Sequence, residues 1–265
     1  MDHTYWRKQT PDTPLFPDLL WSRPEHKKQA GKLGIIGGHA QSFAAAATAY
    51  AEAGKAGIGT ARVLLPDSLE KTVGQIFEAG EYAPSTPSGS FSQRAVADVL
   101  ELAAWGDSLL VAGDLGHNSE TAILLEKLAH DYSGQLTITR DAADYFTDAP
   151  APLLNREDTL LVISFAQLQK LAVQAHFPHA FTFSMDLLRL IDTLHDFTTQ
   201  YRLYVVTKHL ENILVAVNGQ VSSTRLTKDL ETWRVATAAH AATWWLQNPA
   251  KPFEALTSAI WVNPS

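Results

Sequence analysis

The chain has 265 residues, of which 21 are Lys or Arg and 28 are Asp or Glu, so its formal net charge is −7 at pH 7. This acidic balance argues against a groove for nucleic acid as the main functional surface. The chain has no cysteine, which excludes disulfides, thiolate metal sites and cysteine nucleophiles.

The first residues lack the apolar core of a signal peptide, and no stretch is apolar enough to suggest a membrane span. We therefore expect a cytoplasmic protein with no membrane or nucleic-acid partner, folded as one domain over residues 1–265. Residues 1–30 are rich in proline and charge, and they predict an irregular lead-in that packs through Trp6, Phe16 and Trp21.

From Lys32 onward, short apolar runs alternate with helical segments. The predicted strands are Lys32–Gly37, Thr60–Leu65, Ser108–Ala112, Leu136–Thr139, Leu160–Ile163, Arg202–Thr207, Asn212–Val217 and Gln220–Ser223. The predicted helices are Ser42–Ala56, Arg94–Ala104, Ser119–His130, Ala166–Ala175, Met185–Thr199, Leu230–Leu246 and Phe253–Trp261, and a surface loop is expected over Gly80–Ser92.

This alternation predicts an α/β fold of three layers, with a mostly parallel sheet covered on both faces. Asn218-Gly219 stands between two strand-like runs, which favours a hairpin and antiparallel strands at one edge of the sheet. Four tryptophans near the C-terminus are expected to be packing residues: Trp233, Trp244, Trp245 and Trp261.

Ligands of open α/β sheets bind beyond the carboxyl ends of the strands, and this rule selects four places. Gly37-Gly38-His39 offers a tight turn that lets an anion approach a helix N-terminus, although a turn without a ligand is equally compatible. The segment Ala112–Asn118 combines two glycines with Asp114, and Asn118 can cap the next helix.

The third place is Arg140-Asp141, which fits a ligand or magnesium contact, or else a salt bridge or helix cap. The fourth is Thr227-Lys228-Asp229, where Asp229 is either a helix cap or a general base. His176 and His179 flank a proline and have no metal-ligand spacing, and the common phosphate, dinucleotide and serine-nucleophile motifs are absent.

In order along the chain, these places resemble the ADP/ATP-dependent NAD(P)H-hydrate dehydratases, from about residue 20 to the end. That family opens with an arginine, a His-Lys pair, a glycine and a strand ending in Gly-Gly. The matching positions here are Arg23, His26-Lys27, Gly31, Gly37-Gly38, Ala44-Ala45, Lys55-Ala56-Gly57, Asp114-Leu115-Gly116, Asp141, Lys208, Asp229 and Pro252–Ala255.

The resemblance implies a ribokinase-like α/β/α fold and a metabolite-repair lyase that dehydrates hydrated NADH or NADPH. Such an enzyme phosphorylates the hydrate hydroxyl from ATP or ADP, with Mg²⁺, and then eliminates phosphate. By this resemblance Asp229 is the catalytic base. The implied substrate-binding residues are Gly38, His39, Ala45, Gly116, Asp141 and Ser164, and the implied nucleotide-binding residues are Lys208, His209, Leu210, Glu211, Asn212 and Lys228.

The chain also differs from the family pattern at three motifs. The Gly-Thr-Gly-Asp phosphate nest is Leu226-Thr227-Lys228-Asp229, the Thr-Pro-His-Pro-Gly-Glu segment is Val162–Gln167, and the Lys-Gly-x-x-Thr loop is Lys208–Asn212. Two other functions therefore stay open: a non-catalytic relative that binds a nucleotide or a partner, and a ribokinase-like kinase of a small metabolite. The sequence also leaves open whether copies form a homo-oligomer.

Overall fold

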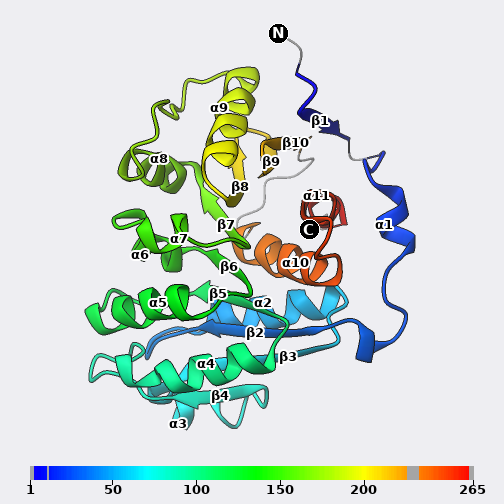
Figure 1. The fold of residues 1–265 in the computed structure, drawn as a ribbon. Coiled ribbons are helices and arrows are strands. Elements are labelled where there is room, and N and C mark those ends of the chain that lie inside the picture. The colour runs from blue at the N-terminus through cyan, green and yellow to red at the C-terminus, as the bar shows by residue number, and fades with distance from the viewer. Residues whose placement is uncertain (1–2, 11, 226–232, 263–265) are drawn as a thin grey trace.

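The computed structural model describes residues 3–10, 12–225 and 233–262. Within these ranges the strands are β1 (Trp6–Gln9), β2 (Lys32–Gly37), β3 (Thr60–Pro66), β4 (Gly80–Ala83), β5 (Ser108–Gly113), β6 (Gln135–Thr139), β7 (Thr159–Ser164), β8 (Leu203–His209), β9 (Asn212–Val217) and β10 (Gln220–Arg225). They form one ten-stranded sheet in the order β1-β10-β9-β8-β7-β6-β5-β2-β3-β4 (Figure 1).

The α-helices are α1 (Pro17–Trp21), α2 (Ala44–Lys55), α3 (Glu70–Val73), α4 (Val96–Trp105), α5 (Ser119–Asp131), α6 (Asp141–Thr147), α7 (Ala151–Leu154), α8 (Phe165–Gln174), α9 (Leu187–Gln200), α10 (Trp233–Gln247) and α11 (Pro252–Val262). Figure 1 shows α4, α5, α6, α8 and α9 on one side of the sheet and α2, α10 and α11 on the other. The predicted three-layer α/β fold is thus confirmed. Within the described ranges no helix is both long and apolar enough to cross a membrane.

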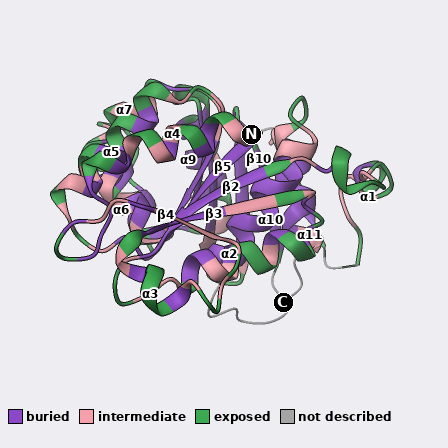
Figure 2. Cartoon of the chain, turned by 90° about the horizontal axis from the view of Figure 1, so that it is seen from below, coloured by how far each residue is buried: buried purple, intermediate pink, exposed green. Residues whose placement is uncertain are grey.

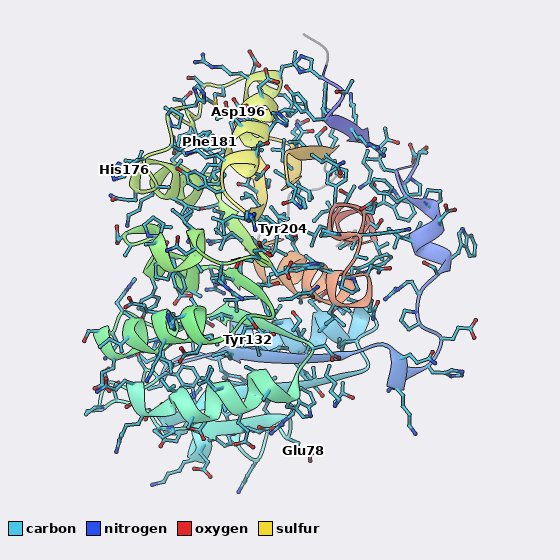
Figure 3. All side chains as sticks on the ribbon, in the orientation of Figure 1. Glu78, Tyr132, His176, Phe181, Asp196 and Tyr204 are labelled. Carbon is cyan, nitrogen blue, oxygen red and sulfur yellow. The ribbon has the colours of Figure 1, made fainter. Side chains whose placement is uncertain are left out.

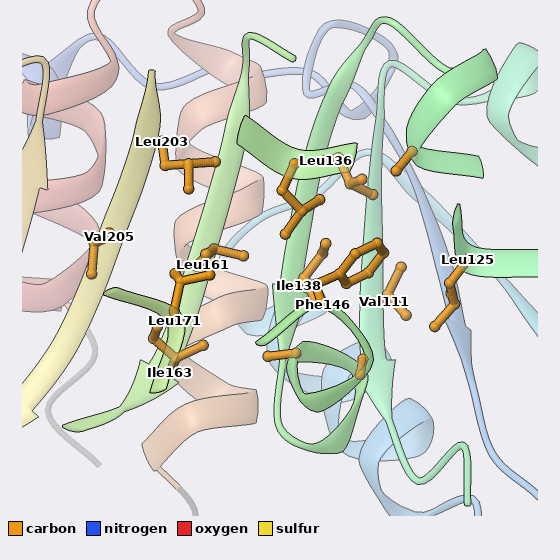
Figure 4. Close-up of a cluster of buried hydrophobic side chains, with 14 of the residues drawn as sticks. Val111, Leu125, Leu136, Ile138, Phe146, Leu161, Ile163, Leu171, Leu203 and Val205 are labelled. Atoms are coloured by element: carbon orange, nitrogen blue, oxygen red, sulfur yellow. The ribbon is translucent and has the colours of Figure 1, made fainter. Parts of the chain in front are cut away.

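The central strands are buried on both faces, and their side chains alternate between two hydrophobic cores. In β5, Leu109 and Val111 join the core under α4, α5 and α8, whereas Leu110 and Ala112 join the core under α2 and α10. Figure 4 shows part of the first core, including Val111, and Figure 2 shows the buried residues concentrated on the strands. Each fully buried Leu or Val side chain contributes about 1.5–3 kcal/mol, so this alternation fixes the register of the sheet.

Helices α2 and α10 pack closely because the faces they turn inward are made of alanine. The buried residues are Ala45, Ala46, Ala49 and Ala53 in α2 and Ala238, Ala239, Ala241 and Ala242 in α10. Trp244 and Trp245 are fully buried at the end of α10, as expected of packing residues, while Trp233 and Trp261 are half-buried.

The predicted hairpin at Asn218-Gly219 is confirmed, because both residues have positive φ and join the antiparallel strands β9 and β10. The antiparallel strands do not end the sheet, however. Strand β1 pairs in parallel with β10, with Trp6 opposite Val221 and Gln9 opposite Thr224. The expectation of an irregular lead-in is therefore wrong for residues 6–9, where backbone pairing with a distant strand outweighs the polar local sequence.

Two further expectations about loops and packing need correction. Residues 80–92 do not form a plain surface loop, because Gly80–Ala83 form edge strand β4 and Phe91 is fully buried. Trp21 does not pack inward, since 88% of its surface is exposed. The short helices α3, α6 and α7 were not predicted, whereas the other elements lie within a few residues of their expected positions.

Candidate functional site

The carboxyl ends of β2, β5, β6 and β7 bring four loops to the same edge of the sheet. The loops begin at Gly37, Gly113, Arg140 and Ser164, so three of the four predicted places meet here. The fourth, with Asp229 and Lys228, lies outside the described residues.

Asp114 connects the loop after β5 to the start of α2. Its carboxylate accepts hydrogen bonds from the Ser42 hydroxyl at 2.8 Å and from the backbone N–H of Ala45 at 2.9 Å. The carboxylate thus satisfies a free amide in the first turn of α2, where the helix dipole favours a negative charge. The backbone carbonyl of Asp114 contacts His39 Nδ1 at 2.9 Å, which holds the predicted residues His39 and Ala45 beside it.

Asp141 holds the same loop from the next strand. Its two carboxylate oxygens accept the backbone N–H groups of Asp114 at 2.7 Å and Leu115 at 2.8 Å. Gly113 has φ +107°, and a Cβ atom there would lie 2.6 Å from Asp141 Oδ1. Glycine at this position therefore allows both the turn and the approach of the carboxylate, and Asp141 positions the loop.

Arg140 carries the first positive charge of the site. It has φ +55° and donates from a guanidinium nitrogen to Asp114 Oδ1 at 2.9 Å, and Asp114 itself has φ +57°. Two non-glycine residues in this sparsely populated region cost on the order of 1–3 kcal/mol each, and such strain clusters at functional sites.

Gln167 joins the loops that follow β6 and β7. Ser164 caps α8, and its side chain and that of Gln167 form a reciprocal capping box. The Gln167 amide also donates to the carbonyl of Arg140 and to Asp144 Oδ1, both at 2.7 Å. The predicted residue Ser164 therefore anchors Gln167, which in turn fixes Arg140 and Asp144.

Arg234 supplies a second positive charge that the sequence reading did not identify. It is the second residue of α10, and it donates to Gln167 Oε1 at 3.3 Å. Burial lowers the pKa of Arg234, and the charge of Arg140 lowers it further, while Asp144 and Asp141 act in the opposite direction. Two cations therefore face each other at the N-terminus of a long helix. We call Asp114, Arg140, Asp141, Asp144, Gln167 and Arg234 the edge cluster.

A polar cavity of about 440 Å³ opens beside the edge cluster. It shares Asp144 with the cluster and is lined as well by His117, Tyr145, Asp148 and Lys170. The Tyr145 hydroxyl donates to the carbonyl of Gly116, which links this cavity to another predicted residue. The remaining predicted glycine, Gly38, has φ +96° and donates its N–H to the Gly113 carbonyl at 3.0 Å.

The predicted nucleotide-binding segment, residues 208–212, forms the tight connection between β8 and β9. His209 is 4% exposed and its ring lies 4.6 Å from that of Phe165, whereas Leu210 is 75% exposed. Glu211 forms an ion pair with Arg225 at 2.7 Å, and Asn212 pairs with His209 across the connection. Lys208 precedes this turn, at the carboxyl end of β8.

The described residues contain no group of three or more His, Asp or Glu side chains arranged to hold a metal ion. A magnesium ion bound with a nucleotide usually needs only one or two protein carboxylates, because phosphate oxygens and water supply its other ligands. Asp144 is half-buried in the edge cluster and has the oxygen chemistry that suits such an ion.

No protein-family model matches the sequence, and no curated protein matches it either. Solved structures do match the fold. A ribokinase-like superfamily protein from Enterococcus faecalis aligns with a TM-score of 0.76 at 14% identity, over 100% of this chain and 88% of that chain. A hypothetical protein from Streptococcus mutans aligns with a TM-score of 0.71 at 13% identity, over 91% of this chain and 84% of that chain.

An ADP/ATP-dependent NAD(P)H-hydrate dehydratase from Bacillus subtilis, co-crystallised with ATP/Mg²⁺, aligns with a TM-score of 0.62 at 11% identity. That alignment covers 96% of this chain and 88% of the other. At these identities the likeness establishes the fold, so the chain has the ribokinase-like architecture.

Proposed function

We propose that this protein uses ATP or ADP to phosphorylate the hydroxyl of hydrated NADH or NADPH and then eliminates phosphate. The observation that carries the proposal is the meeting of Arg140 and Arg234 at the first turn of α10. The segment with the expected base, Asp229, directly precedes this helix in the sequence.

Phosphoryl transfer depends mainly on positioning and on positive charge around the transferred group. The first turn of a helix already attracts anions through its free N–H groups and its dipole. A cation there is unfavourable unless an anion joins it, and Arg140 adds a second positive charge. We infer that these arginines hold the transferred phosphoryl group, a role that the glycines of the Gly-Thr-Gly-Asp motif serve in the dehydratase family.

In the proposed reaction, Asp229 accepts the proton of the hydrate hydroxyl, and the hydroxyl oxygen attacks the terminal phosphorus of the nucleotide. The nucleotide leaves with one phosphoryl group fewer. The new phosphate ester then loses phosphate together with a proton from the neighbouring ring carbon, which restores the carbon–carbon double bond. A nucleotide-bound Mg²⁺ would supply further charge neutralisation, with Asp144 as its protein ligand.

Asp141 and Gln167 act in this proposal as positioning residues. Asp141 fixes the loop from Gly113 to Leu115, and Gln167 orients Arg234. The hydrate would lie over Gly116, at the mouth of the polar cavity that contains His117 and Asp144. One structural neighbour, the Bacillus subtilis dehydratase, was co-crystallised with ATP/Mg²⁺, which supports the choice of nucleotide.

The test is the recovery of reduced-nicotinamide absorbance when the protein is mixed with hydrated NADH, magnesium and either ATP or ADP. We expect Asp229→Asn to abolish recovery and Arg234→Gln to slow it by about a hundredfold, the loss typical when one preorganised donor is removed. Arg189→Gln, which removes an exposed cation of α9, should leave the rate unchanged.

Two results would contradict the proposal. One is the absence of recovery with either nucleotide from folded protein, and stabilisation by ADP without turnover would then indicate a binding protein. The other is nucleotide hydrolysis that proceeds equally with and without the hydrate. Phosphorylation of a different hydroxylated metabolite would identify a small-metabolite kinase instead.

A further inference from the structure

A second cavity, of about 530 Å³, lies between α5, α6 and α7, on the opposite side of Tyr145 from the polar cavity. Its volume falls in the range of small-molecule sites. Most of its lining is apolar and comes from Ala122, Ala129, Phe146, Ala149, Ala151 and Pro152. The proposed reaction makes no use of this space.

Arg156, which follows α7, contributes a buried cation to the lining. The residue is 9% exposed, and its Nη2 atom donates to the carbonyl of Gly134 at 2.6 Å. Its Nε and Nη1 atoms are shielded from solvent and have no hydrogen-bond partner in the described part of the chain. The guanidinium also lies over the ring of Tyr132, labelled in Figure 3, with its carbon 5.7 Å from the ring centroid.

No carboxylate among the described residues forms an ion pair with Arg156. Burial lowers the pKa of Arg156, while Tyr132 and Asp158 act against that effect. A buried guanidinium with two unused N–H groups is unfavourable by itself, and it is stabilised by any anion that pairs with it.

The other polar residues of the lining do not supply that anion. Glu126 and His130 are exposed side chains of α5, and the His130 ring contacts its neighbour Asp131 at 2.7 Å. Asn155 is exposed and uncharged, and Tyr145 is engaged with Gly116. Arg156 is therefore the buried charge of this cavity, and the surfaces around it are largely apolar.

We propose that this cavity binds a small carboxylic acid with a flat apolar body, whose carboxylate pairs with the Arg156 guanidinium. A planar guanidinium forms two parallel hydrogen bonds with a carboxylate, and Nε and Nη1 are a suitable adjacent pair of donors. The apolar body would pack against Ala129, Phe146 and Pro152. This inference is independent of the proposed reaction.

The experiment measures binding of benzoate, and of its uncharged analogue benzamide, to the full chain by isothermal titration and ligand-observed NMR. We expect benzoate to bind at least about tenfold more tightly than benzamide, because a hydrogen-bonded charge contributes about 1.5–3 kcal/mol. Arg156→Met should reduce benzoate binding to the level of benzamide. The matched control Arg202→Met removes an exposed cation paired with Glu157 and should leave binding unchanged.

A second variant, Ala122→Leu, fills the cavity from α5 without changing its charge, so it tests the location even if Arg156→Met fails to fold. It should abolish binding of both probes. The proposal is overturned if benzoate does not bind the wild-type protein at tens of millimolar, if it binds no better than benzamide, or if folded Ala122→Leu retains full affinity.

Discussion

Replacing Asp141 by Asn tests whether this carboxylate holds the loop after β5. The carboxylate accepts two backbone N–H groups, from Asp114 at 2.7 Å and Leu115 at 2.8 Å. An Asn side chain has the same shape, but it offers one acceptor oxygen, and its NH₂ group would face the second backbone donor. The substitution therefore weakens one charge-assisted hydrogen bond and replaces the other by two opposed donors.

The magnitude follows from those two bonds. Hydrogen bonds to charged groups contribute about 1.5–3 kcal/mol, and leaving a buried donor unsatisfied costs about 1–3 kcal/mol. Allowing for partial relaxation, we expect Asp141→Asn to lower the free energy of unfolding by about 2–4 kcal/mol. Asp148→Asn is the control, because Asp148 is exposed and its ion pair with Lys170 should contribute at most about 1 kcal/mol.

Urea denaturation followed by circular dichroism measures the change, and native-state hydrogen exchange at the amides of Asp114 and Leu115 locates it. Exchange at these two amides should accelerate in Asp141→Asn and stay as in the wild type in Asp148→Asn. The reasoning is refuted if Asp141→Asn unfolds within about 0.5 kcal/mol of the wild type, the range typical of surface substitutions.

Two further predictions concern pH and the N-terminal segment. Burial holds the pKa of His240 below its ordinary value of 6.5 despite its contact with Glu52, so the unfolded chain binds the extra proton first. Stability should therefore be present above pH 6.5 and fall as the pH drops below that value, and urea titrations of His240→Gln should show a smaller loss. Tyr5 donates to Asp192 at 2.5 Å and stacks on His195, and the hydrogen bond raises the pKa of Tyr5 to about 12. Tyr5→Phe should lower the free energy of unfolding by about 1 kcal/mol below pH 10 and remove the loss that the wild type shows from pH 10 to about pH 12; equal urea midpoints at pH 8 would contradict this.

The features that could be predicted from the sequence are those encoded by neighbouring residues. Alternating apolar runs gave the buried parallel strands, and Asn218-Gly219 identified the hairpin because both residues tolerate positive φ. The rule that ligand loops follow the carboxyl ends of strands placed Asp114 and Asp141 at one edge of the sheet.

The features that could not be predicted depend on residues far apart in the chain. Arg234 becomes part of the edge cluster through Gln167, which lies 67 positions earlier. Arg140 adopts positive φ although its side chain gives no local reason to do so. The same separation hid Asp141's positioning role, because its hydrogen-bond partners belong to the preceding β–α unit.

The pairing of β1 with β10 affects the order in which the chain can fold during synthesis. Gln9 and Thr224, which are joined by a side-chain hydrogen bond across these strands, are 215 positions apart. At ribosomal rates of about 5–20 residues per second, β1 waits on the order of 10–40 s for its partner strand to be made. Its short and polar sequence, Trp6–Gln9, suits that interval, since charged edge strands resist pairing with other chains. The first strand to leave the ribosome is thus among the last to join the sheet.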